Sequence, residues 1–170
     1  MRMKRLFLMM FALLLTSNML SAQEQNKSRM YNRTYRADME LVWHNPRTWG
    51  FATSHGYSFG NGLYVGGGAG FTAEYADYNS DPAYILPLFA DVKYNFLNKK
   101  ISPYLSAKAG GYADVTSIDV QGIRTFINPA IGLDFNRVSI EVGYEYQLGC
   151  WGHRNGEHIH QFKCGVGLSF

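Results

Sequence analysis

Hydrophobic and polar residues alternate along most of the chain, and no segment shows a convincing 3.6-residue apolar period. In the clearest case, 138–148, every even position is apolar or aromatic and every odd position is polar or glycine. Turn residues such as Gly and Asn separate these segments. The pattern predicts eight β-strands, at 35–43, 49–59, 63–75, 84–96, 101–116, 125–135, 138–148 and 161–170.

The two faces of these strands differ in a way that separates two kinds of β protein. A soluble sandwich turns its charged face to water, whereas a transmembrane barrel turns its apolar face to lipid and its polar face to the lumen. Glycine falls on the charged face here, where a narrow lumen would need room for Tyr64, Tyr104 and Tyr112. All charges placed in strands share that face: Arg36, Lys93, Lys108, Lys163, Asp38, Glu40, Glu74, Asp91, Asp114, Asp134, Glu141 and Glu145.

The connections support the barrel. Tight turns at 60–62, 97–100 and 136–137 alternate with longer connections at 44–48, 76–83, 117–123 and 149–157, as in outer-membrane barrels. Aromatic residues mark both ends of the apolar face: Tyr35, Phe59, Phe96, Phe135 and Phe170 at the short-turn end, and Trp43, Trp49, Tyr75, Tyr84 and Tyr146 at the other. We therefore predict an all-β fold, an eight-stranded antiparallel up-and-down transmembrane β-barrel.

Three prolines fall inside predicted strands, where proline removes a hydrogen bond of the sheet. We expect β-bulges at Pro87, Pro103 and Pro129.

The N-terminus has the layout of a secretory signal peptide. Three basic residues precede the apolar run Leu6 to Leu15, and the small residues Ser21 and Ala22 follow. We predict a signal peptide at 1–22, cleaved after Ala22, a polar and flexible periplasmic tail at 23–33, and a barrel domain at 34–170. A run of 18 apolar residues, which a transmembrane helix needs, does not occur.

The signal peptide also explains the net charge of +3. It carries three basic residues and no acidic one, so its removal leaves 13 of each among the 16 basic and 13 acidic residues of the chain. Nucleic-acid binding needs a clustered basic face, and the balanced remainder argues against it.

The chain resembles the small eight-stranded outer-membrane barrels of the OmpA and OmpX type over about residues 34–170. The resemblance rests on HGYSFGNGLYVGGGAG at 55–70, FLNKKISPYLSAKAGGY at 96–112 and the last strand CGVGLSF. It implies a monomer in the bacterial outer membrane, in contact with outer-membrane lipid, without a cofactor. The terminal Phe170 after alternating apolar residues is similar to the signal read by the outer-membrane barrel assembly machinery.

Candidate chemistry is sparse. Cys150, His153, His158 and His160 have residue types and spacing that can bind zinc or copper, but an exposed polar loop has the same composition. We favour that reading and predict no metal site. We also expect Cys150 and Cys164 to be free thiols, because the expected register places Cys164 opposite residues 144–146 and Cys150 opposite 158–160, too far apart for a disulfide.

Three other functions remain open. Some barrels of this size modify lipid A, but alternation sends Ser54 and His55 to opposite faces, and His44 has no nearby Ser in its strand; we therefore predict no enzyme. A narrow porin-like channel with weak cation preference is the second alternative, since the predicted lumen holds four basic and eight acidic residues. A soluble lipocalin-like binder is the third. The preferred function is a structural, membrane-integrity or surface-interaction role.

Overall fold

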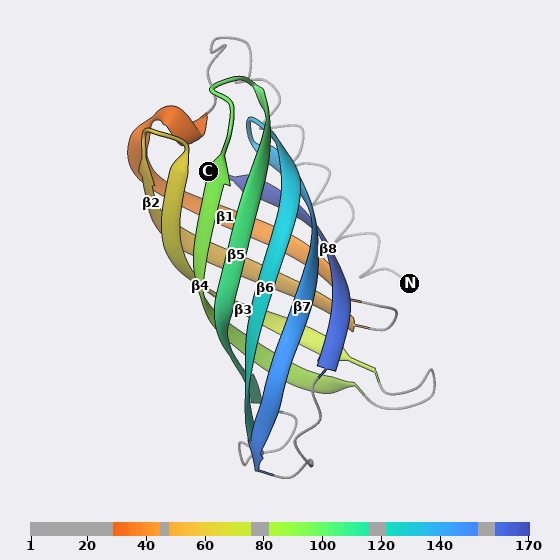
Figure 1. Ribbon diagram of the computed structural model, residues 1–170. Coiled ribbons are helices and arrows are strands. Elements are labelled where there is room, and N and C mark those ends of the chain that lie inside the picture. Colours follow the sequence, from red (N-terminus) through yellow and green to blue (C-terminus); the bar gives the residue numbers. More distant parts are fainter. Residues whose placement is uncertain (1–28, 45–47, 76–81, 116–121, 153–158) are drawn as a thin grey trace, which may run out of the picture.

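Eight antiparallel strands follow one another around a closed barrel in the computed structural model, which describes residues 29–44, 48–75, 82–115, 122–152 and 159–170 (Figure 1). Strand β1 pairs with β8 and closes the sheet, so the predicted all-β, eight-stranded antiparallel barrel is confirmed. The strands are β1 (Arg33–His44), β2 (Thr48–Phe59), β3 (Leu63–Glu74), β4 (Ala83–Asn95), β5 (Ile101–Asp114), β6 (Gly122–Phe135), β7 (Val138–Gly152) and β8 (Ile159–Ser169).

The strands are staggered, and this stagger sets the shape of the barrel. A circuit through paired residues that starts at Thr34 of β1 returns to β1 at His44, ten residues farther along the strand. In an eight-stranded barrel this shear corresponds to strands tilted by roughly 40°. Figure 1 shows the strands inclined to the long direction of the barrel. Eight strands leave a lumen just wide enough for side chains to fill.

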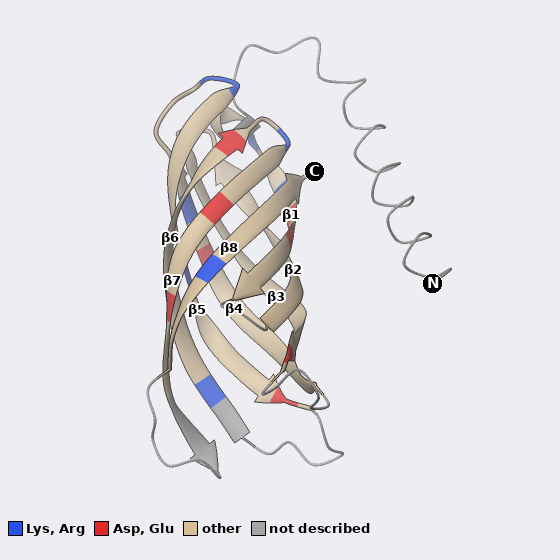
Figure 2. Ribbon diagram, turned by 90° about the vertical axis from the view of Figure 1, so that its right-hand side faces the viewer, with Lys and Arg blue, Asp and Glu red and all other residues tan. Residues whose placement is uncertain are grey.

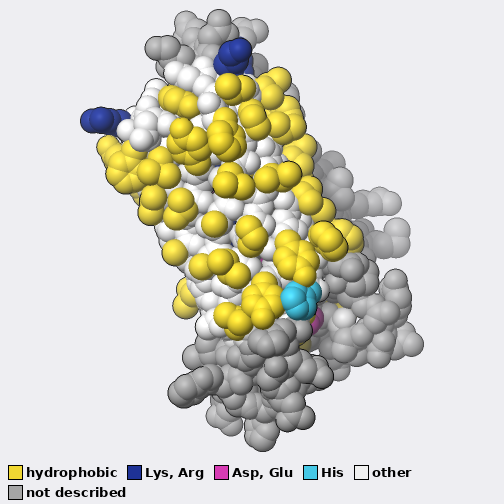
Figure 3. Space-filling model, viewed as in Figure 1, with side chains coloured by type: hydrophobic (Ala, Val, Ile, Leu, Met, Phe, Trp, Pro, Cys, Tyr) yellow, Lys and Arg dark blue, Asp and Glu magenta, His cyan; other side chains and the backbone are white. Residues whose placement is uncertain are grey.

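The predicted faces are confirmed along all eight strands. Apolar side chains cover the outside of the barrel (Figure 3), with Ile131, Leu88 and Phe162 at least 62% exposed. Polar side chains point inward, where Lys93 and Glu145 are at most 4% exposed. Among the described residues, no Lys, Arg, Asp or Glu faces outward between the aromatic residues at the two ends of the wall.

Glycine makes room for the inward tyrosines, as the sequence predicts. A side chain at Gly132 would overlap the ring of Tyr104, and one at Gly66 would overlap Tyr64. Tyr112 is accommodated differently, because its ring stacks on Phe126 with 4.4 Å between the ring centroids.

The prolines do not cause the predicted bulges. Pro87 is not paired in the ladder between β4 and β3, and Pro129 is not paired in the ladder between β6 and β7. On both sides of each proline the register is the same. Pro103 is paired without interruption, and its carbonyl accepts a hydrogen bond from the Phe96 amide at 3.0 Å. Losing one amide donor therefore interrupts the ladder locally without adding a residue. The register shift that does occur lies between Ile123 and Thr125 of β6.

The segment before the barrel differs from the expected flexible tail where it is described. Residues 1–28, which include the predicted signal peptide, lie outside the described residues. Arg29–Tyr31 forms the 3-10 turn η1, in which Met30 is completely buried. The Met30 carbonyl accepts a hydrogen bond from Ser58 Oγ at 2.7 Å, and Tyr31 Oη donates to the Asn95 carbonyl at 3.1 Å. The end of the tail thus packs against the short-turn end of the barrel. No helix in the described part of the chain has the length and apolar character to cross a membrane.

The exposed apolar wall leads to a first prediction. Ile131, 66% exposed and near the middle of the wall, should tolerate Ile131→Leu, whereas Ile131→Arg places a charge in lipid. We expect the arginine variant to lower the free energy of unfolding by about 2–4 kcal/mol. Reversible denaturant unfolding in lipid vesicles measures this, and equal stability of the two variants would contradict a lipid-facing position.

Candidate functional site

The centre of the lumen holds two lysines between two glutamates. Lys108 of β5 places Nζ 2.6 Å from Glu40 Oε2 and 2.9 Å from Glu141 Oε1. Lys163 of β8 lies 3.7 Å from Oε1 of both glutamates. None of the four side chains is more than 13% exposed. We call these residues the central cluster; its two positive and two negative charges compensate one another, which burial requires.

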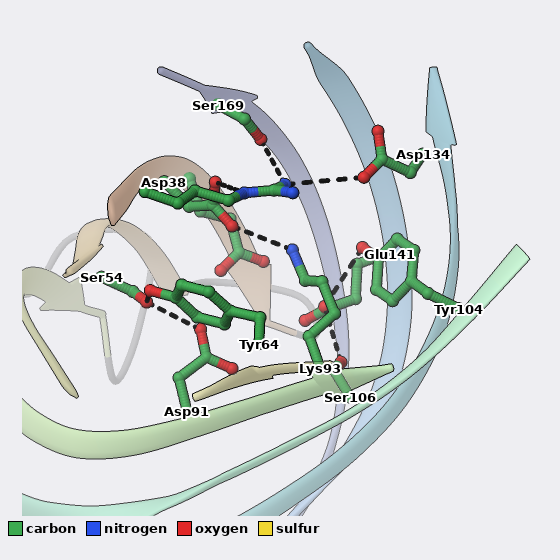
Figure 4. A network of polar contacts seen from close by, with 12 residues as sticks. Asp38, Ser54, Tyr64, Asp91, Lys93, Tyr104, Ser106, Asp134, Glu141 and Ser169 are labelled. Atoms are coloured by element: carbon green, nitrogen blue, oxygen red, sulfur yellow. Dashed lines mark hydrogen bonds and ion pairs between the residues drawn. The ribbon is translucent and has the colours of Figure 1, made fainter. Parts of the chain in front are cut away.

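A second group of ion pairs lies toward the short-turn end (Figure 4). Arg36 contacts Asp38 through Nε at 2.7 Å, and its Nη2 lies 2.6 Å from Ser169 Oγ and 3.5 Å from Asp134 Oδ2. Lys93 Nζ contacts the other Asp38 oxygen at 3.1 Å. Asp38 therefore joins two cations from different strands.

Hydroxyl groups extend these contacts across the lumen (Figure 4). Ser54 Oγ donates to Asp91 Oδ2 at 2.9 Å and lies 2.6 Å from Tyr64 Oη. Tyr104 and Ser106 donate to Glu141 Oε2 at 3.3 and 2.8 Å. Neutral donors therefore satisfy carboxylate oxygens that the lysines do not reach.

A third group lies toward the opposite end. Glu145 accepts hydrogen bonds from Tyr112 Oη at 2.7 Å and from Gln147 Nε2 at 2.8 Å, and its Oε2 lies 3.2 Å from His44 Nε2. Nearer that end, Arg124 pairs with Glu74 at 3.2 Å. Polar contacts thus run along the lumen from one end toward the other.

Little space is left between these side chains. The cavities have volumes of about 20, 30 and 10 Å³, each of the size of one or two water molecules. The largest of these three touches Phe89, Tyr112 and Lys163, so aromatic rings as well as charges fill the cross-section. A substrate or cofactor of ordinary size has no room in these three cavities.

The described lumen holds one basic residue more than the sequence analysis predicts. Arg124 also faces inward, so the described lumen holds five basic residues against eight acidic ones, an acidic excess of three rather than four. Arg124 lies one residue before the predicted strand 125–135, and extending the alternation would have identified it. His44 belongs to β1 and continues its inward positions, whereas the sequence predicts a connection at 44–48.

The predicted metal candidates do not form a described cluster. His153 and His158 lie outside the described residues, as does the side chain of Cys150. His160 faces outward on β8, where its Nδ1 lies 2.7 Å from Tyr144 Oη and its ring packs against Tyr146. Within the described ranges, no three His, Cys, Asp or Glu side chains are grouped so that they could hold a metal.

Cys164 has a free thiol. In the register of β7 and β8 it lies opposite Val142, and not opposite the predicted residues 144–146. The expected register was therefore wrong by at least two residues. Val142 precedes Cys150 by eight residues on β7, a separation of roughly 27 Å along a strand. That distance is far beyond the Cα limit of about 7 Å for a disulfide.

Ser54 and His55 lie on opposite faces, as predicted. His55 is instead part of a hydrogen-bonded chain on the outer wall: its Nδ1 lies 2.6 Å from Tyr35 Oη, and its Nε2 lies 3.0 Å from Thr53 Oγ1. Thr53 donates its single proton to the Asp38 carbonyl at 3.2 Å. A neutral imidazole ring then donates from Nε2 to Thr53 and accepts at Nδ1 from Tyr35. In this arrangement His55 is no base for Thr53, and the chain satisfies polar groups that face lipid.

Comparison with known proteins supports the fold. The sequence matches no protein-family model and no curated protein. Among solved structures, the chain is similar to the outer membrane enzyme PagL, with a TM-score of 0.54 and 13% identity over 78% of this chain and 98% of that chain. It is also similar to Neisserial surface protein A, NspA, with a TM-score of 0.51 and 16% identity over 82% of this chain and 99% of that one. The chain therefore has the fold of the small eight-stranded outer-membrane β-barrels.

The central cluster generates the second prediction. Lys108→Met removes the cation that is closest to both Glu40 and Glu141 and leaves their charges incompletely compensated. We expect this variant to lose about 3–5 kcal/mol of unfolding free energy. In Lys108→Met/Glu141→Gln the remaining charges balance better, so part of the loss should be recovered in denaturant unfolding of the refolded barrel. Additive losses in the double variant would argue against a coupled pair.

Proposed function

We propose that this chain is an integral protein of the bacterial outer membrane, exported by a cleaved signal peptide at residues 1–22, with a structural or surface-interaction role and no enzymatic activity. The observation that carries the proposal is a barrel with an apolar wall and a lumen closed by ion pairs. Such a barrel fits a membrane and leaves little space for transport or chemistry inside.

The closed lumen argues against the channel alternative. Lys108, Lys163, Glu40 and Glu141 reach across the centre from four strands, and the remaining cavities are of water size. A permeating ion would have to separate buried ion pairs in a medium of low dielectric constant, which is costly.

The wall argues against the enzyme alternative. The described histidines that face lipid, His55 and His160, are both bonded to tyrosine hydroxyls. The Thr53 hydroxyl, 3.0 Å from His55 Nε2, donates to a backbone carbonyl instead of to the ring. The similarity to PagL at 13% identity concerns the fold and supports no shared activity.

The distribution of side chains argues against a soluble binder. A lipocalin-like protein would bury its apolar residues around a ligand cavity, whereas here Ile131, Leu88 and Val142 are at least half exposed and the interior is charged. We infer that the short turns face the periplasm, as in barrels of this class. The partners in this proposal are outer-membrane lipid and, through the strand that ends at Phe170, the barrel assembly machinery; the protein acts as a monomer.

The third prediction concerns the location of the protein after cell fractionation. The full-length protein should appear in the detergent-extracted outer membrane and should migrate faster before boiling than after it, because a closed barrel resists unfolding in detergent. Lipid A from the same membranes should keep its number of acyl chains. Release into the soluble fraction, or an altered acyl number, would overturn the corresponding part of the proposal.

Electrical recording supplies the fourth prediction. Purified protein in a planar bilayer should give no discrete current steps above background in molar KCl, because the lumen is occupied by side chains. Lys108→Ser/Lys163→Ser removes two large side chains and raises the acidic excess, so any current it admits should be cation-selective. Regular steps from the unaltered protein would contradict the closed lumen.

A further inference from the structure

The chain segment before β1 lies across the short-turn mouth of the lumen. Met30 and Tyr31, in the turn η1, precede β1 in the sequence, yet their contacts reach β2 and β4. The Met30 carbonyl accepts a hydrogen bond from Ser58 Oγ at 2.7 Å, and Tyr31 Oη donates to the Asn95 carbonyl at 3.1 Å. Figure 1 shows that the described chain starts at the same end of the barrel as the C-terminus. The segment therefore crosses the mouth instead of extending β1.

Side chains at this mouth are fully buried, although they stand at the very end of the lumen. Ser58 holds the last inward position of β2 and Asn95 the last of β4, and both are 0% exposed. At the opposite end of the lumen, the side chains of Glu74 and Arg124 are 33% and 16% exposed. The short-turn mouth is therefore covered, and Met30, itself completely buried, contacts Ser58 as part of the cover.

The β2–β3 turn leaves room for Tyr31. Gly62 has a φ of +88°, which favours glycine, and a side chain there would lie 3.1 Å from Tyr31 Oη and would overlap the Asn95 carbonyl. Met30 has an unbranched, flexible side chain of the kind that fills irregular gaps. The turn and the segment thus fit each other.

Charged groups lie directly below this cover. Asn95 Nδ2 donates to Asp134 Oδ2 at 3.3 Å, and the same oxygen lies 3.5 Å from Arg36 Nη2. Acidic and basic positions lie close to this end of the barrel (Figure 2). Ion pairs are stronger where water is excluded, because the local dielectric constant is lower. An uncovered mouth would bring water and dissolved ions to these groups.

From these contacts we propose that residues 29–31 form a stopper, which closes the lumen at its short-turn mouth and opens without unfolding of the barrel. A single buried side chain and a few hydrogen bonds hold the stopper, whereas a closed backbone ladder joins the strands. Such a segment can open by itself at a fraction of the free energy of global unfolding. The stopper is a property of the folded barrel and does not depend on the role proposed above.

Thiol labelling beneath Met30 tests the stopper. In a Cys150→Ala/Cys164→Ala background, Ser58→Cys places a thiol of nearly the same size under the Met30 carbonyl. We expect the folded protein in detergent to react with a charged methanethiosulfonate far more slowly than the unfolded chain in urea. Met30→Gly should raise the rate in the folded protein on the order of tenfold or more. The matched control Met30→Leu keeps most of the apolar volume and should keep the rate low.

A second thiol shows where the effect occurs. Thr48→Cys, at the opposite end of β2, should react at the same rate with and without Met30→Gly. The heat-dependent shift in migration confirms that each variant is folded. If Met30→Gly does not fold, Tyr31→Phe, which loses the hydrogen bond to the Asn95 carbonyl and keeps the ring, should still raise the Ser58→Cys rate about fivefold.

Three results would overturn the stopper. The first is labelling of Ser58→Cys in the otherwise unaltered, folded protein at the rate of the unfolded chain, which would show an open mouth. The second is full protection of that thiol in folded Met30→Gly and Tyr31→Phe, which would show that other residues close the mouth. The third is equal acceleration at Ser58→Cys and Thr48→Cys, which would indicate loosening of the whole barrel.

Discussion

The structure depends on the mutual compensation of charges inside a lumen too narrow for bulk water. Lys108 and Lys163 come from β5 and β8, and their carboxylate partners Glu40 and Glu141 come from β1 and β7. Strands β1 and β5 are not neighbours in the sheet, so the 2.6 Å contact of Lys108 with Glu40 spans the barrel. Buried charges without partners are strongly destabilising, and only the closed arrangement brings these four together.

The apolar wall has a different role. In lipid, apolar side chains gain little from contact with one another, because the surrounding hydrocarbon is equally apolar. Leu88, Ile131 and Phe162 therefore stabilise insertion of the barrel, while its internal arrangement depends on backbone pairing and on the polar lumen. Because the outer face is apolar and the lumen face is polar, a mean hydropathy of −0.20 is compatible with a membrane-spanning fold. The average over the chain combines the two faces and reveals neither.

The sequence predicts well which residues of a strand face the lumen or the outside. It predicts poorly which residues lie opposite one another in neighbouring strands or across the lumen, for a physical reason. Alternation is a local property, so the inward positions of Lys93, Lys108 and Glu141 follow from parity within each strand. Register depends on turn geometry and on irregularities in neighbouring strands. An expected register displaced by at least two residues therefore put Cys164 opposite 144–146 instead of Val142. Contacts across the lumen depend on the accumulated stagger of all eight strands, which no single segment encodes.

The chemistry open to a side chain depends on the hydrogen bonds and ion pairs that it already makes. Parity alone places Thr53 and His55 on the lipid face, but only the structure shows that the Thr53 hydroxyl donates to the Asp38 carbonyl while it lies 3.0 Å from His55 Nε2. Inside the barrel, the carboxylates Asp38, Glu40, Glu141 and Glu145 are all engaged by cations, histidine or hydroxyl groups.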